Sequence, residues 1–249
     1  LFRARPIVYQ FMLASQGVGS IQRQIHAPSF KNVLTIVPPL ETQKSIAAFL
    51  DERTKAIDEL VAKKEKMIEL LREKRSTVIN DATTNVNGNT EKLKYISTER
   101  MAEPDTALNG LKYIGLENVE SGTGKTVGAE EKSDTESSVK IFRKDDVLFG
   151  KLRPYLAKVF PSDFDGVCSG EFLTLIPRKD KISSKYLFYR LVSKDFIKAV
   201  DDSTYGTKMP RANWQFIGSQ FITYPSLDSQ KRIVDILDYE TARLGSAIF

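Results

Sequence analysis

The sequence has 249 residues, of which 41% are hydrophobic, and its formal net charge is +5. Its single cysteine, Cys168, and single histidine, His26, exclude an internal disulfide and a zinc site built on four Cys or His ligands. No apolar run approaches the ~20 residues that cross a membrane. These properties favour one or two globular domains with an anionic partner.

A long helix is predicted at residues 39–84. It follows a short apolar strand, predicted at Val33–Val37, which Pro38 ends because proline cannot donate to a sheet ladder. No glycine or proline occurs between Leu40 and Gly88, and apolar residues recur with the heptad spacing of a coiled coil. We expect the apolar seam of this helix to include Ile46, Leu50, Ile57, Leu60 and Leu71.

The segment that opens this helix occurs twice. Pro-Pro-Leu-Glu-Thr-Gln-Lys-Ser-Ile at residues 38–46 returns as Pro-Ser-Leu-Asp-Ser-Gln-Lys-Arg-Ile at residues 225–233, 187 positions later. Two copies of a domain followed by a helix explain this offset better than a tandem solenoid, whose period is much shorter. The start of the second helix, residues 227–249, carries seam positions of its own at Ile233, Leu237 and Leu244. We expect it to pack against the first helix, within one chain or between two chains.

The repeat also indicates to which domain each part of the chain belongs. Residues 1–38 correspond to the C-terminal part of a first domain, and residues 85–226 form the second domain. Because the sequence begins without methionine, we expect it to be part of a longer protein.

The domain at residues 85–226 is predicted to be α+β, because its strands and helices do not alternate as in βαβ units. Segments rich in β-branched and aromatic residues predict strands at Tyr113–Leu116, Asp146–Phe149, Ala157–Phe160, Phe172–Ile176 and Phe221–Tyr224. Helices are predicted at Ser184–Leu191 and Lys194–Val200. Polar segments at residues 83–90, 121–138 and 203–214 are predicted to be a linker and two loops.

Catalytic motifs are incomplete in this domain. The run Gly-Thr-Gly-Lys-Thr at residues 122–126 is similar to the end of a phosphate-binding loop, but Val119 stands where that motif requires a glycine. No nucleophile motif accompanies His26, and the sequence shows no cluster of metal-binding carboxylates and no methyl-donor motif. Cys168 is interpreted as a small buried apolar residue. We therefore expect no catalytic residue, cofactor or metal ion in this chain.

Two loops combine cations with aromatic and amide side chains, at Lys151–Lys158 and Tyr205–Trp214. Cations bind phosphates, arginine forks can read guanine, and asparagine can read adenine. A recognition surface must gather its readers on one side, so we predict that both loops converge on a concave, positively charged face. Lys151, Lys158 and Lys208 are assigned to phosphates, and Arg153, Arg211 and Asn213 to base edges. Tyr155 is a further candidate, although Tyr155 and Trp214 suit the anchoring of their loops to the core equally well.

The repeated segment resembles a conserved region of a known family. The pattern Pro-Pro-Leu-Glu-x-Gln-x-x-Ile-x-x-x-Leu-Asp at residues 38–51, echoed at residues 225–238, is similar to the region that closes each target-recognition domain in specificity subunits of type I restriction-modification enzymes. The stretches Asp145–Tyr155 and Cys168–Phe172 are similar to recurrent features inside those domains. The resemblance covers essentially the whole chain.

The resemblance implies target-recognition domains joined by long antiparallel helices of the coiled-coil type. Each domain would read one half of a bipartite double-stranded DNA target, while the helices fix the spacing and dock methyltransferase subunits, which restriction subunits then join. Adenine methylation with S-adenosylmethionine and cleavage with ATP and Mg would reside in those partners. The chain itself would be non-catalytic and cytoplasmic. Both a part of a full subunit and a half-subunit that dimerises are compatible with the sequence.

Two other classes of protein remain open on the residues alone. The first is a structural protein whose coiled coil mediates oligomerisation and whose α+β domain binds protein or carbohydrate. The second is an enzyme with an unrecognised site. Neither class predicts an affinity for DNA that falls steeply with salt.

Overall fold

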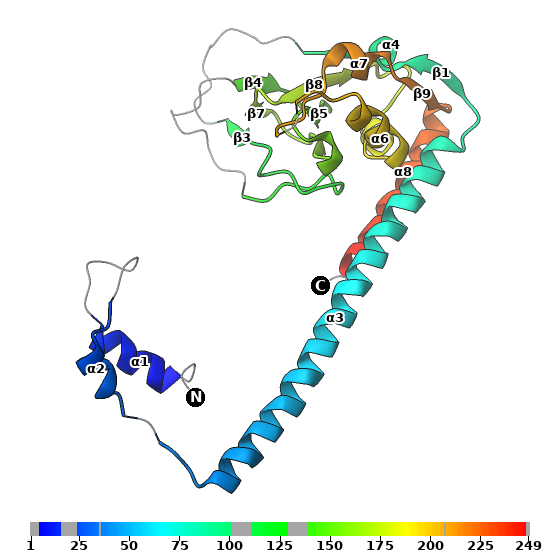
Figure 1. Ribbon diagram of the computed structural model, residues 1–249. Helices are drawn as coiled ribbons and strands as arrows, with labels where there is room; N and C mark the ends of the chain where they lie inside the picture. Colours follow the sequence, from blue (N-terminus) through cyan, green and yellow to red (C-terminus); the bar gives the residue numbers. More distant parts are fainter. Residues whose placement is uncertain are drawn as a thin grey trace. The chain divides into compact units, whose positions relative to one another are not determined.

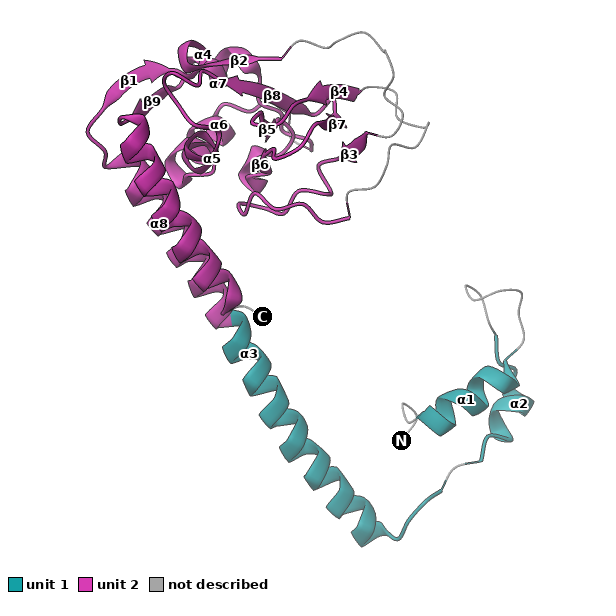
Figure 2. Cartoon of the chain, turned by 180° about the vertical axis from the view of Figure 1, so that it is seen from behind, with its two compact units in different colours: residues 1–65 teal, residues 66–249 magenta. Residues whose placement is uncertain are grey.

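The computed structural model describes residues 5–15, 24–34, 36–100, 111–128, 139–206 and 208–247. The chain divides into two units, Leu1–Glu65 and Lys66–Phe249, and the boundary lies within the long helix α3 (Leu40–Thr84; Figure 2). None of the helices in these described ranges is both long enough and apolar enough to span a bilayer.

The first unit contains α1 (Arg5–Ala14), α2 (Ala27–Lys31) and the N-terminal part of α3. The ring of Phe11 stacks on that of Phe30 with 5.6 Å between centroids, which joins α1 to α2. The strand predicted at Val33–Val37 is wrong, since the described residues of that range are not in a strand. Its counterpart in the repeat becomes a strand by pairing with a neighbour, whereas the described part of the first unit holds no strand to pair with.

Helix α3 is continuous over 45 residues, which confirms the predicted long helix. Ile46, Leu50, Ile57 and Leu60, the seam residues of its N-terminal part, are each 48–59% exposed. A helix of 45 residues spans ~67 Å, whereas the 20 residues of α8 (Leu227–Ser246) span ~30 Å.

The second unit combines three sheets with five further helices among its described residues (Figure 1), which confirms the α+β class. An antiparallel sheet has the order β2-β8-β5-β6, from β2 (Ser97–Glu99), β8 (Phe172–Pro177), β5 (Val147–Gly150) and β6 (Val159–Pro161). A three-stranded sheet places β7 (Gly166–Ser169) between β3 (Lys112–Ile114), which is parallel to it, and β4 (Val139–Phe142), which is antiparallel. A two-stranded ribbon pairs β1 (Asn89–Lys92) with β9 (Phe221–Tyr224). The helices are α4 (Leu93–Ile96), α5 (Ser184–Leu191), α6 (Lys194–Asp202), α7 (Trp214–Ser219) and α8.

Strand β5 lies between two hydrophobic cores. Successive residues of a strand point to opposite faces of its sheet. Val147 and Phe149 accordingly join the core that includes α5 and α6, whereas Leu148 joins a second core with Phe142 and Cys168 of the three-stranded sheet. The burial of Cys168 confirms its interpretation as a small core residue. The basic loop at Lys151–Lys158 therefore leaves a strand that is fixed on both faces.

The C-terminal part of α3 and α8 run side by side in opposite directions (Figures 1 and 2). Ile79 of α3 lies in the same hydrophobic core as Val234 and Leu237 of α8. Among the predicted seam residues, Leu237 and Leu244 are buried, and Leu71 and Ile233 are half-buried. The antiparallel pairing of two helices is thus present within this unit.

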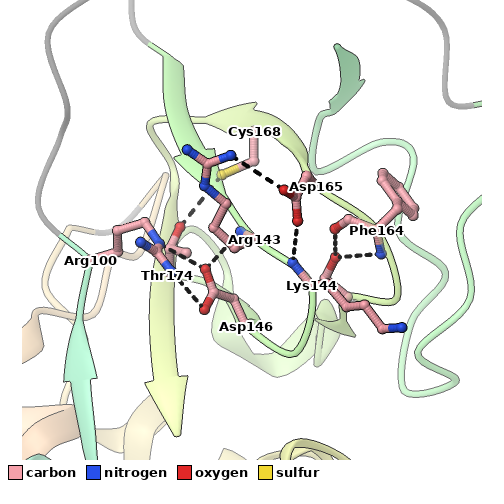
Figure 3. Close-up of polar contacts among 9 residues, drawn as sticks. Arg100, Arg143, Lys144, Asp146, Phe164, Asp165, Cys168 and Thr174 are labelled. Carbon is pink, nitrogen blue, oxygen red and sulfur yellow. Dashed lines mark hydrogen bonds and ion pairs between the residues drawn. The ribbon is translucent and has the colours of Figure 1, made fainter.

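A polar corner fixes the beginning of β5 (Figure 3). The carboxylate of Asp146, which is buried, accepts hydrogen bonds from Nε and Nη2 of Arg100 at 2.8 and 3.1 Å and from the backbone amide of Arg143 at 2.8 Å. Asp165 accepts bonds from the Lys144 amide at 2.7 Å and from Nη1 of Arg143 at 3.3 Å. Strand β5, whose C-terminal end leads into the first basic loop, is therefore fixed at its N-terminal end.

Candidate nucleic-acid interface

The first basic loop begins where β5 ends, at Gly150. A Cβ atom at Gly150 would lie 2.9 Å from the Leu116 side chain and 3.1 Å from the Lys158 carbonyl oxygen, so a larger residue here would have to displace Leu116. Arg153 and Ala157 have φ values of +51° and +47°, in the left-handed region, and flank the 3-10 turn Pro154–Leu156. Residues other than glycine adopt this conformation at a cost and only where the surroundings impose it. The loop is a constrained turn.

The second basic loop supplies part of that constraint. The amide of Arg153 donates to the carbonyl oxygen of Pro210 at 2.8 Å, and the amide of Ala212 donates to that of Lys151 at 3.0 Å. Arg211 forms isolated antiparallel bridges with Leu152 and with Tyr205. Two loops more than fifty residues apart in the sequence are therefore joined through their backbones, which confirms that they converge.

Arg153, Tyr155 and Lys208 are the most open of the predicted readers. All three side chains are exposed, and within the described ranges they make no side-chain hydrogen bond or ion pair. Arg153 itself is the left-handed residue that precedes the 3-10 turn, so it lies at the turn and outside β5. These three side chains can meet a ligand without first breaking an internal contact.

Arg211 is held by a carboxylate. Its Nη2 and Nε donate to the two oxygens of Glu171 at 2.6 and 3.2 Å, in a forked ion pair that leaves the remaining N–H groups of the guanidinium for a ligand. Lys151 lies close by, and its backbone amide donates to the Glu171 carbonyl at 2.9 Å. Burial lowers the pKa of the Lys151 ammonium, and the neighbouring Lys140 lowers it further. A phosphate would offset both effects by supplying negative charge.

The remaining predicted readers make contacts inside the domain. The ammonium of Lys158 donates to the carbonyl oxygens of Leu116 and Val119, each at 2.8 Å. Asn213 is the N-cap of α7, where its Oδ1 accepts from the Phe216 amide at 2.8 Å. Trp214 packs against the main core, which favours the anchoring role. Lys158 and Asn213 therefore support the loops, and their contacts with DNA stay predictions.

Glu171 is a member of this site that sequence reasoning missed. Its carboxylate orients Arg211 and its carbonyl group holds Lys151, yet forty residues separate it from Arg211. The sequence therefore gave no local pattern that predicts the ion pair between Glu171 and Arg211. In the described part of the chain, moreover, no cluster of three or more His, Cys, Asp or Glu side chains could hold a metal ion.

Comparisons with known proteins give the family. The profile described as "Type I restriction modification DNA specificity domain" matches residues 72–244. The chain is 27% identical over 124 residues to the type I restriction enzyme EcoDI specificity subunit of Escherichia coli, a match that covers 49% of this chain and 27% of that protein.

The fold is also found in a solved structure. A chain from the structure described as "Structural basis underlying complex assembly and conformational transition of the type I R-M system" superposes with a TM-score of 0.72 at 16% identity, covering 97% of this chain and 62% of that one. The HsdS subunit of Thermoanaerobacter tengcongensis matches with a TM-score of 0.49 at 19% identity, covering 98% and 62%. This chain thus spans less than two thirds of each of these relatives.

The family profile covers the C-terminal part of α3, the α+β domain and nearly all of α8, which are the parts that carry the joined loops and the second copy of the repeat. It confirms the resemblance inferred from the Pro-x-Leu-x-x-Gln repeat. The chain belongs to the family of type I restriction-modification DNA specificity proteins.

Proposed function

We propose that this chain selects the DNA target of a type I restriction-modification complex, and that the two joined loops are its DNA-contacting surface. One observation carries this proposal. The bonds from Arg153 to Pro210 and from Ala212 to Lys151 join the two loops that carry the exposed cations Arg153, Lys208 and Arg211, which supports a shared surface. Such cations neutralise phosphates, and an arginine fork can distinguish guanine from the other bases.

The proposal extends to the wider assembly. Each recognition domain reads one half of a bipartite target, and the paired helices fix the distance between the halves. A stiff spacer of fixed length converts two weak readers into one specific reader. The exposed apolar residues of α3, Ile46 to Leu60, are consistent with a helix that holds a partner.

Methyltransferase subunits dock on the helices in this proposal, and restriction subunits join them. Methyl transfer from S-adenosylmethionine and cleavage driven by ATP and Mg belong to those partners. The chain itself is then non-catalytic and works in the cytoplasm, where the DNA of such a complex lies. Purified alone, it should neither methylate nor cleave DNA.

The experiment that tests the DNA surface uses the chain assembled with its methyltransferase. Binding to the complex's own target and to scrambled DNA is measured across a range of salt concentrations. Lys208→Ala should weaken binding to both DNAs and reduce the slope of log K against log salt by about one. Arg153→Ala should instead cost roughly 1–3 kcal/mol on the target and relax its selectivity at one position.

Lys144→Ala is the matched control, because Lys144 is an exposed cation at the opposite end of β5 from the loops. Its side chain points away from the carboxylates of the polar corner (Figure 3). Unchanged binding in both loop variants, or an equal loss in the control, would show that the DNA surface lies elsewhere. A coiled-coil structural protein, the alternative class, predicts no salt-dependent DNA affinity in any variant.

A further inference from the structure

The Gly-Thr-Gly-Lys-Thr run at residues 122–126 forms the tip of a hairpin. Val119 and Thr126 form an antiparallel bridge, and the amide of Glu120 donates to the carbonyl oxygen of Lys125 at 2.9 Å. Gly122 and Gly124 have φ values of +67° and +71°, which suit a tight turn and require glycine. A phosphate-binding loop leads into a helix, whereas none begins in the described residues up to 128. The run therefore has another role.

The hairpin is bonded to the first basic loop. The amide of Gly122 donates to the carbonyl oxygen of Ala157 at 3.0 Å, at the end of the turn that carries Arg153 and Tyr155. The two bonds from Lys158 described above hold the base of the hairpin from the same side. These contacts make the hairpin a direct neighbour of the proposed DNA surface.

The tip of the hairpin also packs against the domain. A Cβ atom at Gly124 would lie 2.7 Å from the ring of Phe188 and 3.2 Å from the ring of Pro161. Thr123 closes the tip internally, because its hydroxyl bonds to the Glu120 carboxylate at 2.9 Å. An ordinary exposed loop has few such attachments and moves freely. This hairpin is held in one position.

The third attachment comes from the long helix. Nη1 of Arg75, a half-buried residue of α3 in the second unit, donates to the carbonyl oxygen of Gly122. Gly122 thus connects helix α3 to the turn at Pro154–Leu156. Its carbonyl oxygen accepts a hydrogen bond from Arg75, and its amide donates one to Ala157.

Lys125 is the free cation of this hairpin. Its side chain is exposed and has no ion pair with any residue that the structure describes. The Glu120 carboxylate that faces it across the hairpin is bonded to Thr123. With Arg75 and Lys158, the hairpin has three cations against the two carboxylates of Glu117 and Glu120. Among these five described residues the cations outnumber the carboxylates by one.

We propose that the hairpin at residues 119–126 is a third element of the DNA surface, that Lys125 contacts a backbone phosphate, and that Arg75 positions this contact from helix α3. This inference rests on the proposed function and extends it to residues outside the two basic loops. Lys125 acts as a point charge without base preference, since a flexible ammonium carries no fork geometry. Arg75 acts through Gly122 and does not touch DNA.

The test is salt-dependent DNA binding by the chain assembled with its methyltransferase. Lys125→Ala should reduce the slope of log K against log salt by about one, and should weaken binding to the target and to scrambled DNA by the same factor. Lys144→Ala, which removes an exposed cation outside the hairpin and both basic loops, should leave the slope unchanged. If Lys125→Ala has no effect while Lys208→Ala lowers the slope, this inference is overturned and the proposed function stands. If neither variant lowers the slope, the proposed DNA surface fails as well.

A double-mutant cycle tests the role of Arg75. Arg75→Met should lower the slope as Lys125→Ala does, and should add nothing further when Lys125 is already alanine, because both changes remove one contact. Full additivity would show that Arg75 does not act through Lys125. A purely structural Arg75 would lower the melting temperature and leave the slope intact, which also contradicts the proposal. If Arg75→Met prevents assembly, Arg75→Lys completes the same cycle, since lysine is too short to keep the bond to Gly122 in place.

Discussion

Gln230 and Gln43 occupy equivalent positions in the repeat and make the same hydrogen bond. Nε2 of Gln230 donates to the carbonyl oxygen of Pro225 at 2.9 Å, and Nε2 of Gln43 donates to that of Pro38 at 2.8 Å. The glutamine of the Pro-x-Leu-x-x-Gln segment thus closes the start of each helix onto the proline five residues before it. The sequence repeat is a repeat of local structure.

Gln230 also binds the recognition domain. It is fully buried, its Nε2 donates to the Lys181 carbonyl at 2.7 Å, and its Oε1 accepts from the Ser183 amide at 2.9 Å. Gln230→Ala removes the partners of both backbone groups and should lower the free energy of unfolding by about 2 kcal/mol. Gln43→Ala is the control, because Gln43 is exposed and its change should stay within about 0.5 kcal/mol. Chemical denaturation measures the free energy of unfolding of both variants. Equal losses would contradict the stabilising role of the bonds from Gln230 to the domain.

Arg211 provides a test of base reading. Arg211→Lys keeps the positive charge but loses the planar fork that Glu171 orients. If Arg211 reads a base, both Arg211→Lys and Arg211→Ala should cost roughly 1–3 kcal/mol of selectivity between target and scrambled DNA. The salt slope should fall in the alanine variant and stay nearly unchanged in the lysine variant. If Arg211→Lys keeps full selectivity for the target, Arg211 contacts a phosphate and does not read a base.

The polar corner at the start of β5 predicts a difference between two aspartates. Asp146→Asn removes the charge that faces Arg100 and should lower the free energy of unfolding by about 3 kcal/mol, because the Asp146 side chain is only 3% exposed. Asp165→Asn, in the same corner, should change it by less than about 1 kcal/mol, since the Asp165 side chain is 48% exposed. Thermal and chemical denaturation compare the two variants. A larger loss of unfolding free energy in Asp165→Asn than in Asp146→Asn would contradict this assignment of the buried and exposed ion pairs.

Cys168 should be inert in the folded protein. Burial raises the pKa of its thiol to about 11, so at pH 8 only about one thiol in a thousand would be the reactive thiolate even if reagents reached it. A thiol-specific reagent should therefore label the native chain at the rate of unfolding and the denatured chain at once. The time course of labelling, with and without denaturant, measures this. Rapid labelling of the native chain would contradict the packing of the second core.

Much of the fold could be predicted from apolar patterns. The helix at Ser184–Leu191 and the strand at Phe221–Tyr224 have the predicted bounds, because apolar and aromatic residues mark both segments. Strand β1 was missed, and its first two residues were predicted as the end of a linker, since Asn89–Lys92 is polar and becomes a strand only by pairing with β9. Strands β4 and β7 were missed for a similar reason, because neighbouring strands decide their pairing.

The candidate site was predictable in outline only. The composition of the two basic loops was enough to identify them, and backbone hydrogen bonds join them in the structure. The sequence could not show that Lys158 and Asn213 bind the protein's own backbone, because those partners lie on other elements or depend on where a helix starts. Glu171 and Arg75 were missed because long-range contacts with Arg211 and Gly122 leave no local pattern.

The most direct measurement is a map of methylated bases across the genome of cells that carry this chain and of the same cells without it. Sequence selection by this chain predicts that one bipartite motif is methylated in the first map and unmethylated in the second. Restoring the chain should restore that motif, and restoring it with Arg153→Ala should reduce or relax methylation at one position of it. Identical maps with and without the chain would contradict its role in choosing the DNA target.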